Sequence, residues 1–168
     1  TADLIIFLLG LPLALHLGRR TNQWADRLFS LLAPLASIPS WVHGILLVLV
    51  FSVWLKLLPY SRMFDWLPPE TTWGYITVVA RHMLLPVLAI LLNLFLQCVT
   101  AWRTFFYLYS NEDYVELAVA KGVASGALER RHILRPTLPY IITSFALTLI
   151  GFWQMTTALE FFFYWPGI

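Results

Sequence analysis

The chain has 168 residues, of which 60% are hydrophobic and 12% are charged, and its formal net charge is +2. Soluble domains carry roughly 25% charged residues, so this composition cannot cover the outward faces of a soluble globular fold. The small positive balance argues against nucleic-acid binding, and the single Cys98 excludes a disulfide framework or a cysteine metal site. The chain is therefore predicted to be an integral membrane protein.

Four segments contain no Asp, Glu, Lys or Arg, namely residues 4–18, 28–55, 83–102 and 136–159. A helix needs about 20 apolar residues to cross the roughly 30 Å hydrocarbon core of a bilayer. The segments show no strict alternation of the kind found in membrane β-barrels, so helices are the expected spanning form. We expect about four membrane-spanning helices.

The second of these segments is too long for one upright helix, and it contains Pro34 and Pro39. Proline disrupts a helix interior but is tolerated in a first turn. This predicts a short helix over residues 23–35 and a span over about 40–57. The first segment starts almost at residue 1 and is followed by basic residues, the reverse of a secretory signal peptide, so the sequence is expected to be a fragment.

Basic residues predict the orientation of the helices, because cytoplasmic connections are enriched in Lys and Arg. Loops 18–27 and 103–135 are expected to be cytoplasmic, and loop 59–82 is expected to lie outside. The first two loops hold eight basic residues and the third, with its flanks, holds three: Arg19, Arg20, Arg27, Arg103, Lys121, Arg130, Arg131 and Arg135 against Lys56, Arg62 and Arg81. Aromatic residues would form an interfacial belt around the outer loop: Trp54, Tyr60, Trp66, Trp73 and Tyr75.

The segment 110–139 contains helix start and stop signals that a featureless loop would lack. Ser110, Asn111 and Asp113 are good N-cap residues. Gly122 stands where a residue in the left-handed conformation would end the helix that they begin. The spacing therefore predicts a short helix between the third and fourth membrane spans.

A second short helix is expected to follow, capped by Ser125 and ending before Pro136. Two short helices outside the bilayer would suit docking on another protein, and the small side chain of Ala118 would permit close approach. An amphipathic turn that lies on the membrane surface without a partner is the open alternative.

At this point the residues resemble a known family. Glu116-Leu117-Ala118-x-x-x-Gly122 is similar to the E-A-A-x-x-x-G loop of permease subunits in binding-protein-dependent ABC importers, with Leu117 in place of the usual second Ala. Further positions resemble the oligopeptide, dipeptide and nickel subgroup: Asp113, Tyr114, Lys121, His132, Leu134, Arg135 and Leu138-Pro139 in or after the loop, and Ile38-Pro39-Ser40-Trp41, Leu58-Pro59, His82-x-x-x-Pro86, Glu160 and Trp165-Pro166-Gly167 elsewhere.

The resemblance implies an all-α, polytopic transmembrane bundle of about four to five helices, a fragment of a larger permease. Residues 1–168 would form a single ABC-importer-type transmembrane domain that is truncated at both ends. The loop 110–135 would couple the chain to a cytoplasmic ATPase through six residues: Asp113, Tyr114, Glu116, Ala118, Lys121 and Gly122. The partners would be membrane lipid, a second permease subunit, two ATPase subunits and an extracytoplasmic substrate-binding protein.

The transported solutes would be peptides or related small molecules. No cofactor is expected on this chain, and ATP would bind to the partner subunit, because the sequence has no G-x-x-x-x-G-K-[ST] motif. The chain would therefore be a transport subunit in a cell (inner) membrane and not an enzyme.

Four polar residues inside or beside the spans are candidates for a pathway or gate: Asn93, Gln97, Gln154 and Glu160. Asn93 and Gln97 are four positions apart and would share one helix face. Hydrogen bonding between helices is the alternative role for such amides.

Metal and catalytic sites are not expected, because the four histidines are scattered along the chain and no Ser-His-acid spacing occurs. Other classes of membrane protein stay open as alternatives. A structural or assembly subunit of another multi-helix complex would not need the capped hairpin. A secondary carrier would be expected to show broken helices and coupling-ion ligands.

Overall fold

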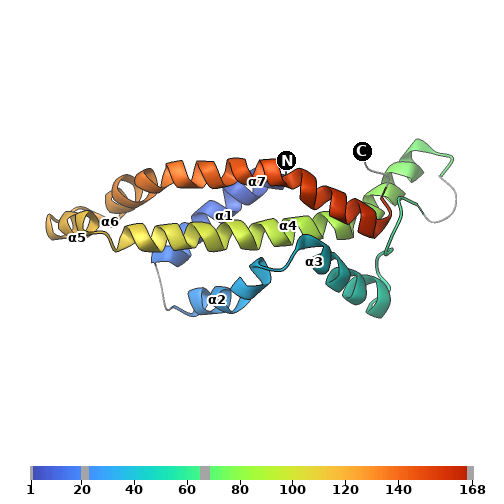
Figure 1. The fold of residues 1–168 in the computed structure, drawn as a ribbon, viewed down its shortest axis with the longest axis horizontal. Helices are drawn as coiled ribbons and strands as arrows, with labels where there is room; N and C mark the ends of the chain where they lie inside the picture. Colours follow the sequence, from blue (N-terminus) through green and yellow to red (C-terminus); the bar gives the residue numbers. More distant parts are fainter. Residues whose placement is uncertain (1, 20–22, 65–68, 166–168) are drawn as a thin grey trace. The chain divides into compact units, whose positions relative to one another are not determined.

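The computed structural model describes residues 2–19, 23–64 and 69–165, and this part of the chain is helical without a β-strand. The expected all-α fold is confirmed. Figure 1 shows the elements, which are α1 (Ala2–Arg19), α2 (Trp24–Ala36), α3 (Ser40–Leu47), the π-helix η1 (Val48–Trp54), α4 (Thr72–Ser110), α5 (Asp113–Ala120), α6 (Ser125–Ala127), the π-helix η2 (Leu128–Leu134) and α7 (Arg135–Phe163). Trp66 of the predicted belt and the Pro166-Gly167 pair lie outside the described residues.

Two described helices are long and apolar enough to cross a membrane, namely Thr72–Ser110 and the continuous run Ser125–Phe163. Helix α2 and the α3–η1 helix pass the same test as a pair, but they bend by 105° at the break between them. A third span exists if that pair counts as one. The apolar helix Ile5–Arg19 is shorter, so by length and composition the structure supports two or three of the four predicted spans.

The split predicted for the second segment is confirmed, because α2 ends at Ala36 and α3 begins at Ser40, directly after Pro39. Helix α4 extends well beyond the predicted span 83–102. Its start is stabilised by Thr71, whose Oγ1 accepts a hydrogen bond of 3.1 Å from the Gly74 amide. Residues 72–82 and 103–110, which were expected to belong to connections, are therefore helical.

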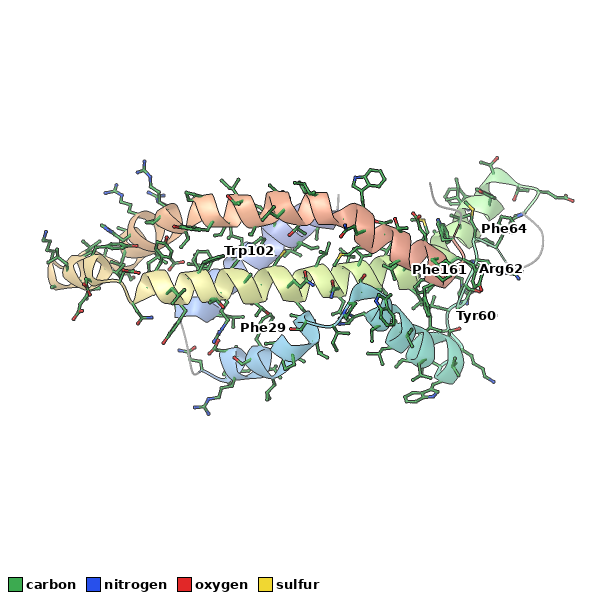
Figure 2. All side chains as sticks on the ribbon, in the orientation of Figure 1. Phe29, Tyr60, Arg62, Phe64, Trp102 and Phe161 are labelled. Carbon is green, nitrogen blue, oxygen red and sulfur yellow. The ribbon has the colours of Figure 1, made fainter. Side chains whose placement is uncertain are left out.

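The chain divides into two compact units, and the first comprises Thr1–Ser37 and Leu94–Ile150. Trp102 of α4, labelled in Figure 2, is fully buried in the core of this unit. The Trp102 indole N–H donates to Ser144 Oγ on α7 at 2.8 Å, and the Phe7 ring of α1 packs edge-on against the indole with centroids 5.7 Å apart. A buried indole needs such an acceptor, and this contact ties α7 to α4.

Helix α1 approaches α4 closely within this unit. A Cβ atom at Gly18 would lie 2.8 Å from Phe106 Cβ and 2.9 Å from the Arg103 carbonyl oxygen. Glycine is therefore required at this crossing, as is common where membrane helices pack backbone to backbone.

The second unit comprises Ile38–Asn93 and Gly151–Ile168. Its buried core joins two residues of α4 to two residues of α7, namely Leu85, Ala89, Leu159 and Phe163. The fully buried Asn93 donates from Nδ2 to the Ile38 carbonyl oxygen at 2.6 Å. That carbonyl lies at the bend between α2 and α3, so Asn93 satisfies a backbone group at the break in the helix.

Candidate functional site

The short helix α5 lies between the two long apolar helices, and it forms a hairpin with the first turns of the second one, α6 and η2; we call residues 113–134 the α5–η2 hairpin. Gly122 has a φ of +75°, the left-handed conformation that the sequence predicted. Its amide donates to the Val119 carbonyl at 2.9 Å, and the Val123 amide donates to the Ala118 carbonyl at 3.1 Å. These two bonds form a complete Schellman motif, which ends α5.

The capping residues predicted for the start of α5 have other roles. Glu112 is the N-cap residue, and no side chain caps this end. Ser110 Oγ instead donates to the Phe106 carbonyl at 2.6 Å, and Asn111 Nδ2 donates to the Tyr107 carbonyl at 2.7 Å. Both side chains therefore satisfy carbonyl groups at the C-terminal end of α4. The prediction was wrong because these residue types donate as readily as they accept.

The second half of the hairpin also differs from the prediction. Ser125 is the first residue of α6, and Ala124 occupies the cap position. The helix does not end before Pro136, because α6, η2 and α7 form one helical run. Pro136 lies inside this run, directly after η2 passes into α7, so its missing N–H leaves a gap in the hydrogen bonding of a continuous helix. Thr137 Oγ1 donates to the carbonyls of Ile133 and Leu134 at 3.0 and 2.8 Å.

Helix α5 has one buried and one exposed face. Val115 and Ala118 are buried, at 4% and 5% exposure, and α5 packs against η2. The small Ala118 therefore permits close packing inside the hairpin, and it does not face a partner as expected. The exposed face carries the other predicted coupling residues together with the apolar side chains of Leu117 and Val119: Asp113, Tyr114, Glu116, Lys121 and Gly122.

The phenol of Tyr114 stays neutral at physiological pH. Burial, together with the nearby Glu112 carboxylate, raises the pKa of Tyr114 above its ordinary value of 10.0. The exposed face of α5 therefore presents Tyr114 as a neutral hydrogen-bond donor.

Two ion pairs within the first unit were not predicted. Arg19 Nη1 pairs with Glu129 Oε2, which connects the end of α1 to η2 of the hairpin. Arg103 Nε contacts the buried Asp26 Oδ1 at 2.5 Å, which connects α4 to α2. The pairs join positions 110 and 77 residues apart, so no local spacing could reveal them. The one available signal was that Asp26 and Glu129 lie among predominantly basic connections.

The four candidate pathway residues occupy different surroundings. Asn93 is fully buried and hydrogen-bonded to the backbone, which is the alternative role considered for it. Gln97 and Gln154 are exposed on α4 and α7. Glu160 is partly buried at the C-terminal part of α7, where it lines two cavities of the second unit.

The second unit contains cavities that are lined partly by charged side chains. The first, of about 330 Å³, is lined by Lys56, Arg81 and His82, and the Arg81 guanidinium donates to the Leu57 carbonyl at 2.8 Å. The others, of about 220 and 480 Å³, share Thr156 and Glu160. Among the described residues, no group of three or more His, Cys, Asp or Glu side chains could hold a metal ion.

Residues 6–168 match the family described as binding-protein-dependent transport system inner membrane component. The chain is 30% identical to the peptide transport system permease protein SapB of Salmonella typhimurium, over 96% of this chain and 56% of that protein. It is 27% identical to the putrescine export system permease protein SapB of Escherichia coli K12, with the same coverage. It is 28% identical to the glutathione transport system permease protein GsiC of Salmonella typhimurium, over 96% and 48%. The chain thus spans about half the length of these relatives.

Proposed function

The chain belongs to the family of binding-protein-dependent transport system inner membrane components, and from this premise we propose that it is a permease subunit of an ABC importer. As a multi-pass protein of the inner membrane, it would form part of the translocation pathway. The solutes would be peptides or related small molecules, because its relatives are named for peptide, putrescine and glutathione transport.

The observation that carries this proposal is the α5–η2 hairpin. Its helix α5 joins two helices that are long enough to span a membrane, and the buried residues Val115 and Ala118 hold α5 against η2, the start of the second of them. The exposed face of α5 therefore stands on a supported element, as a docking surface requires. We propose that Asp113, Glu116 and Lys121 on this face contact a cytoplasmic ATPase subunit, which would bind and hydrolyse ATP.

The proposed orientation places loops 18–27 and 103–135 in the cytoplasm and loop 59–82 outside. A second permease subunit would complete the pathway, and a substrate-binding protein would deliver solute to the outer face. Closure of two ATPases would move the hairpins, and the helices continuous with them would carry that motion toward the pathway. In this scheme the present chain would hold no cofactor of its own.

The test is recovery of the ATPase with the full-length parent protein. The parent would be purified from membranes with its candidate ATPase, either unchanged or carrying Glu116→Lys. Charge reversal on the exposed face of α5 should remove most of the ATPase from the purified sample. Glu70→Lys is the matched control, because Glu70 is an exposed carboxylate of the second unit, far along the chain from the hairpin.

Equal recovery of the ATPase with both variants would contradict the docking role of α5. Absence of any ATPase from the unchanged protein would contradict the importer assignment and favour a structural subunit of another membrane complex. Both variants must reach the membrane in normal amounts for the comparison to count, which a fluorescent C-terminal fusion would report.

A further inference from the structure

Two cavities of the second unit share Glu160 of α7. The larger, of about 480 Å³, is lined by Phe152, Trp153, Thr156, Thr157 and Glu160. The smaller, of about 220 Å³, has Thr156, Glu160 and Trp165 in its wall together with residues of α4. Glu160 and Thr156 therefore lie between two adjoining spaces, with aromatic side chains on either side.

The hydroxyl oxygens of Thr156 and Thr157, which line the larger cavity with Glu160, are free to accept hydrogen bonds. Thr156 Oγ1 donates its proton to the Phe152 carbonyl at 2.7 Å, and Thr157 Oγ1 donates to the Trp153 carbonyl at 2.9 Å. Each hydroxyl then has lone pairs left but no proton to offer. Glu160 follows the two threonines by four and three positions, so the three groups lie on one face of α7.

The Glu160 carboxylate has no cationic group beside it among the described residues that line its two cavities. Within the described part of the chain, the Glu160 carboxylate has no hydrogen-bond or ion-pair partner, and neither cavity is lined by Lys, Arg or His. A carboxylate in a largely apolar cavity favours a cationic ligand, because pairing offsets the cost of its desolvation.

The surroundings favour an organic cation over a metal ion. Ca²⁺ takes six to eight oxygen ligands and Mg²⁺ requires near-octahedral oxygen geometry, whereas this face offers one carboxylate and two hydroxyls. The rings of Phe152, Trp153 and Trp165 can instead attract a cation through their π-faces. A primary ammonium group has three N–H donors, which matches the three acceptors of Thr156, Thr157 and Glu160.

We propose that Glu160, Thr156 and Thr157 form a binding site for a primary ammonium group, provided by a transported solute such as a peptide with a free N-terminus. The choice of solute rests on the proposed transport function, whereas the ammonium chemistry follows from the site itself. Phosphatidylethanolamine carries the same group, so lipid is a second source of the ligand, and the experiment separates the two.

The experiment measures solute binding to the full-length parent protein in lipid nanodiscs made of phosphatidylglycerol. The probes are the dipeptide Ala-Ala and its N-acetylated form, which lacks the ammonium group, and binding is followed by saturation-transfer NMR. We expect Ala-Ala to bind and the acetylated form to bind at least about tenfold more weakly, as is typical for loss of a hydrogen bond to a charged group.

The variant Glu160→Gln keeps the shape of the side chain and removes its charge, so it should weaken Ala-Ala binding by about tenfold or more. Thr157→Val, which removes one acceptor, is the second variant and should weaken binding by a smaller factor. Glu70→Gln is the matched control and should bind like the unchanged protein. Equal binding of Ala-Ala to the unchanged protein and to both site variants would overturn the proposal, as would equal binding of the acetylated dipeptide.

Repeating the measurement in nanodiscs that contain phosphatidylethanolamine identifies the source of the ligand. Competition by that lipid, lost in Glu160→Gln, would assign the ammonium site to a lipid headgroup, whereas unchanged binding would assign it to the solute. Recovery of the ATPase is measured on the same variants. If Glu160→Gln recovers the ATPase normally and also binds Ala-Ala as the unchanged protein does, the ammonium site is overturned and the proposed function is not. If the unchanged protein recovers no ATPase, the proposed function is overturned and the ammonium site is not.

Discussion

Arg103 of α4 donates through Nε to the Asp26 carboxylate of α2 at 2.5 Å, and the Asp26 side chain is 6% exposed. The pair fixes α2 against the end of α4 within the first unit. The sequence places Arg103 only among the basic residues of the loop 103–135, whereas the structure gives it a defined partner. A buried carboxylate tolerates burial only when it is paired in this way.

Removing one member of this pair should destabilise the protein strongly. Asp26→Asn leaves the Arg103 charge uncompensated, and breaking a buried pair costs about 3–5 kcal/mol, reduced here because a quarter of the Arg103 side chain is exposed. The thermal midpoint of the full-length parent in detergent should fall, as measured by fluorescence-detected size exclusion. The double variant Asp26→Leu with Arg103→Met should recover much of the loss, and a double variant as unstable as Asp26→Asn would contradict this account.

Substitution of Gly18 should disrupt the contact between α1 and α4. The added methyl group of Gly18→Ala would meet the Phe106 side chain and the Arg103 backbone at under 3 Å, which costs about 1–3 kcal/mol through forced displacement. Gly151→Ala is the control, because a Cβ there has no neighbour within 4 Å. The same thermal assay should show a clear loss for Gly18→Ala and little change for Gly151→Ala.

Gly122 should respond to substitution according to backbone conformation alone, since a Cβ there meets nothing within 4 Å. Gly122→Ala places a side chain in the left-handed region at a cost of about 1–2 kcal/mol, whereas Asn adopts this region more readily. Hydrogen exchange at the Val123 amide, which closes the Schellman motif, should therefore accelerate more for Ala than for Asn. Gly126→Ala, at a site with equal space and no positive φ, should leave this exchange unchanged.

Asn93 can be assigned to structure or to pathway by one substitution. Asn93→Leu leaves the Ile38 carbonyl without its donor, which costs about 1–3 kcal/mol for a buried polar group. The thermal midpoint should fall accordingly, while Gln154→Leu, at an exposed position, should change the free energy of unfolding by less than about 0.5 kcal/mol. A normal midpoint with impaired transport would instead assign Asn93 to the pathway.

Residues that act on their own backbone predicted the ends of helices correctly. Pro39 followed by Ser40 placed the break between α2 and α3, and Gly122 placed the end of α5, because each residue acts on its own backbone. Ser110 and Asn111 were assigned to the wrong helix end, since their side chains can serve either the helix that ends or the helix that begins. Their neighbours do not decide between the two.

Contacts between residues that lie on different helices could not be predicted from the sequence. Ala118 was expected to face a partner, because its small size alone does not say which face of α5 is covered by η2. The sequence predicted Glu160 as a pathway or gate residue but gave no role to Thr156 and Thr157. Their role as acceptors follows only from the structure, in which their hydroxyl groups donate to the backbone carbonyls of Phe152 and Trp153. Such assignments depend on the donor and acceptor geometry of the folded chain.

The side chains of Ser110 and Asn111 also reduce the negative potential at the C-terminal end of α4, on the cytoplasmic side proposed for the hairpin. The C-terminal end of a long helix carries a partial negative charge on its unpaired carbonyl groups. Here two neutral donors cover the Phe106 and Tyr107 carbonyls, so the end of α4 attracts cations less than a bare helix end would. The field met by an approaching protein then comes chiefly from the exposed charged side chains of the hairpin, Asp113, Glu116, Lys121, Arg130 and Arg131, and added salt should slow that approach by screening them.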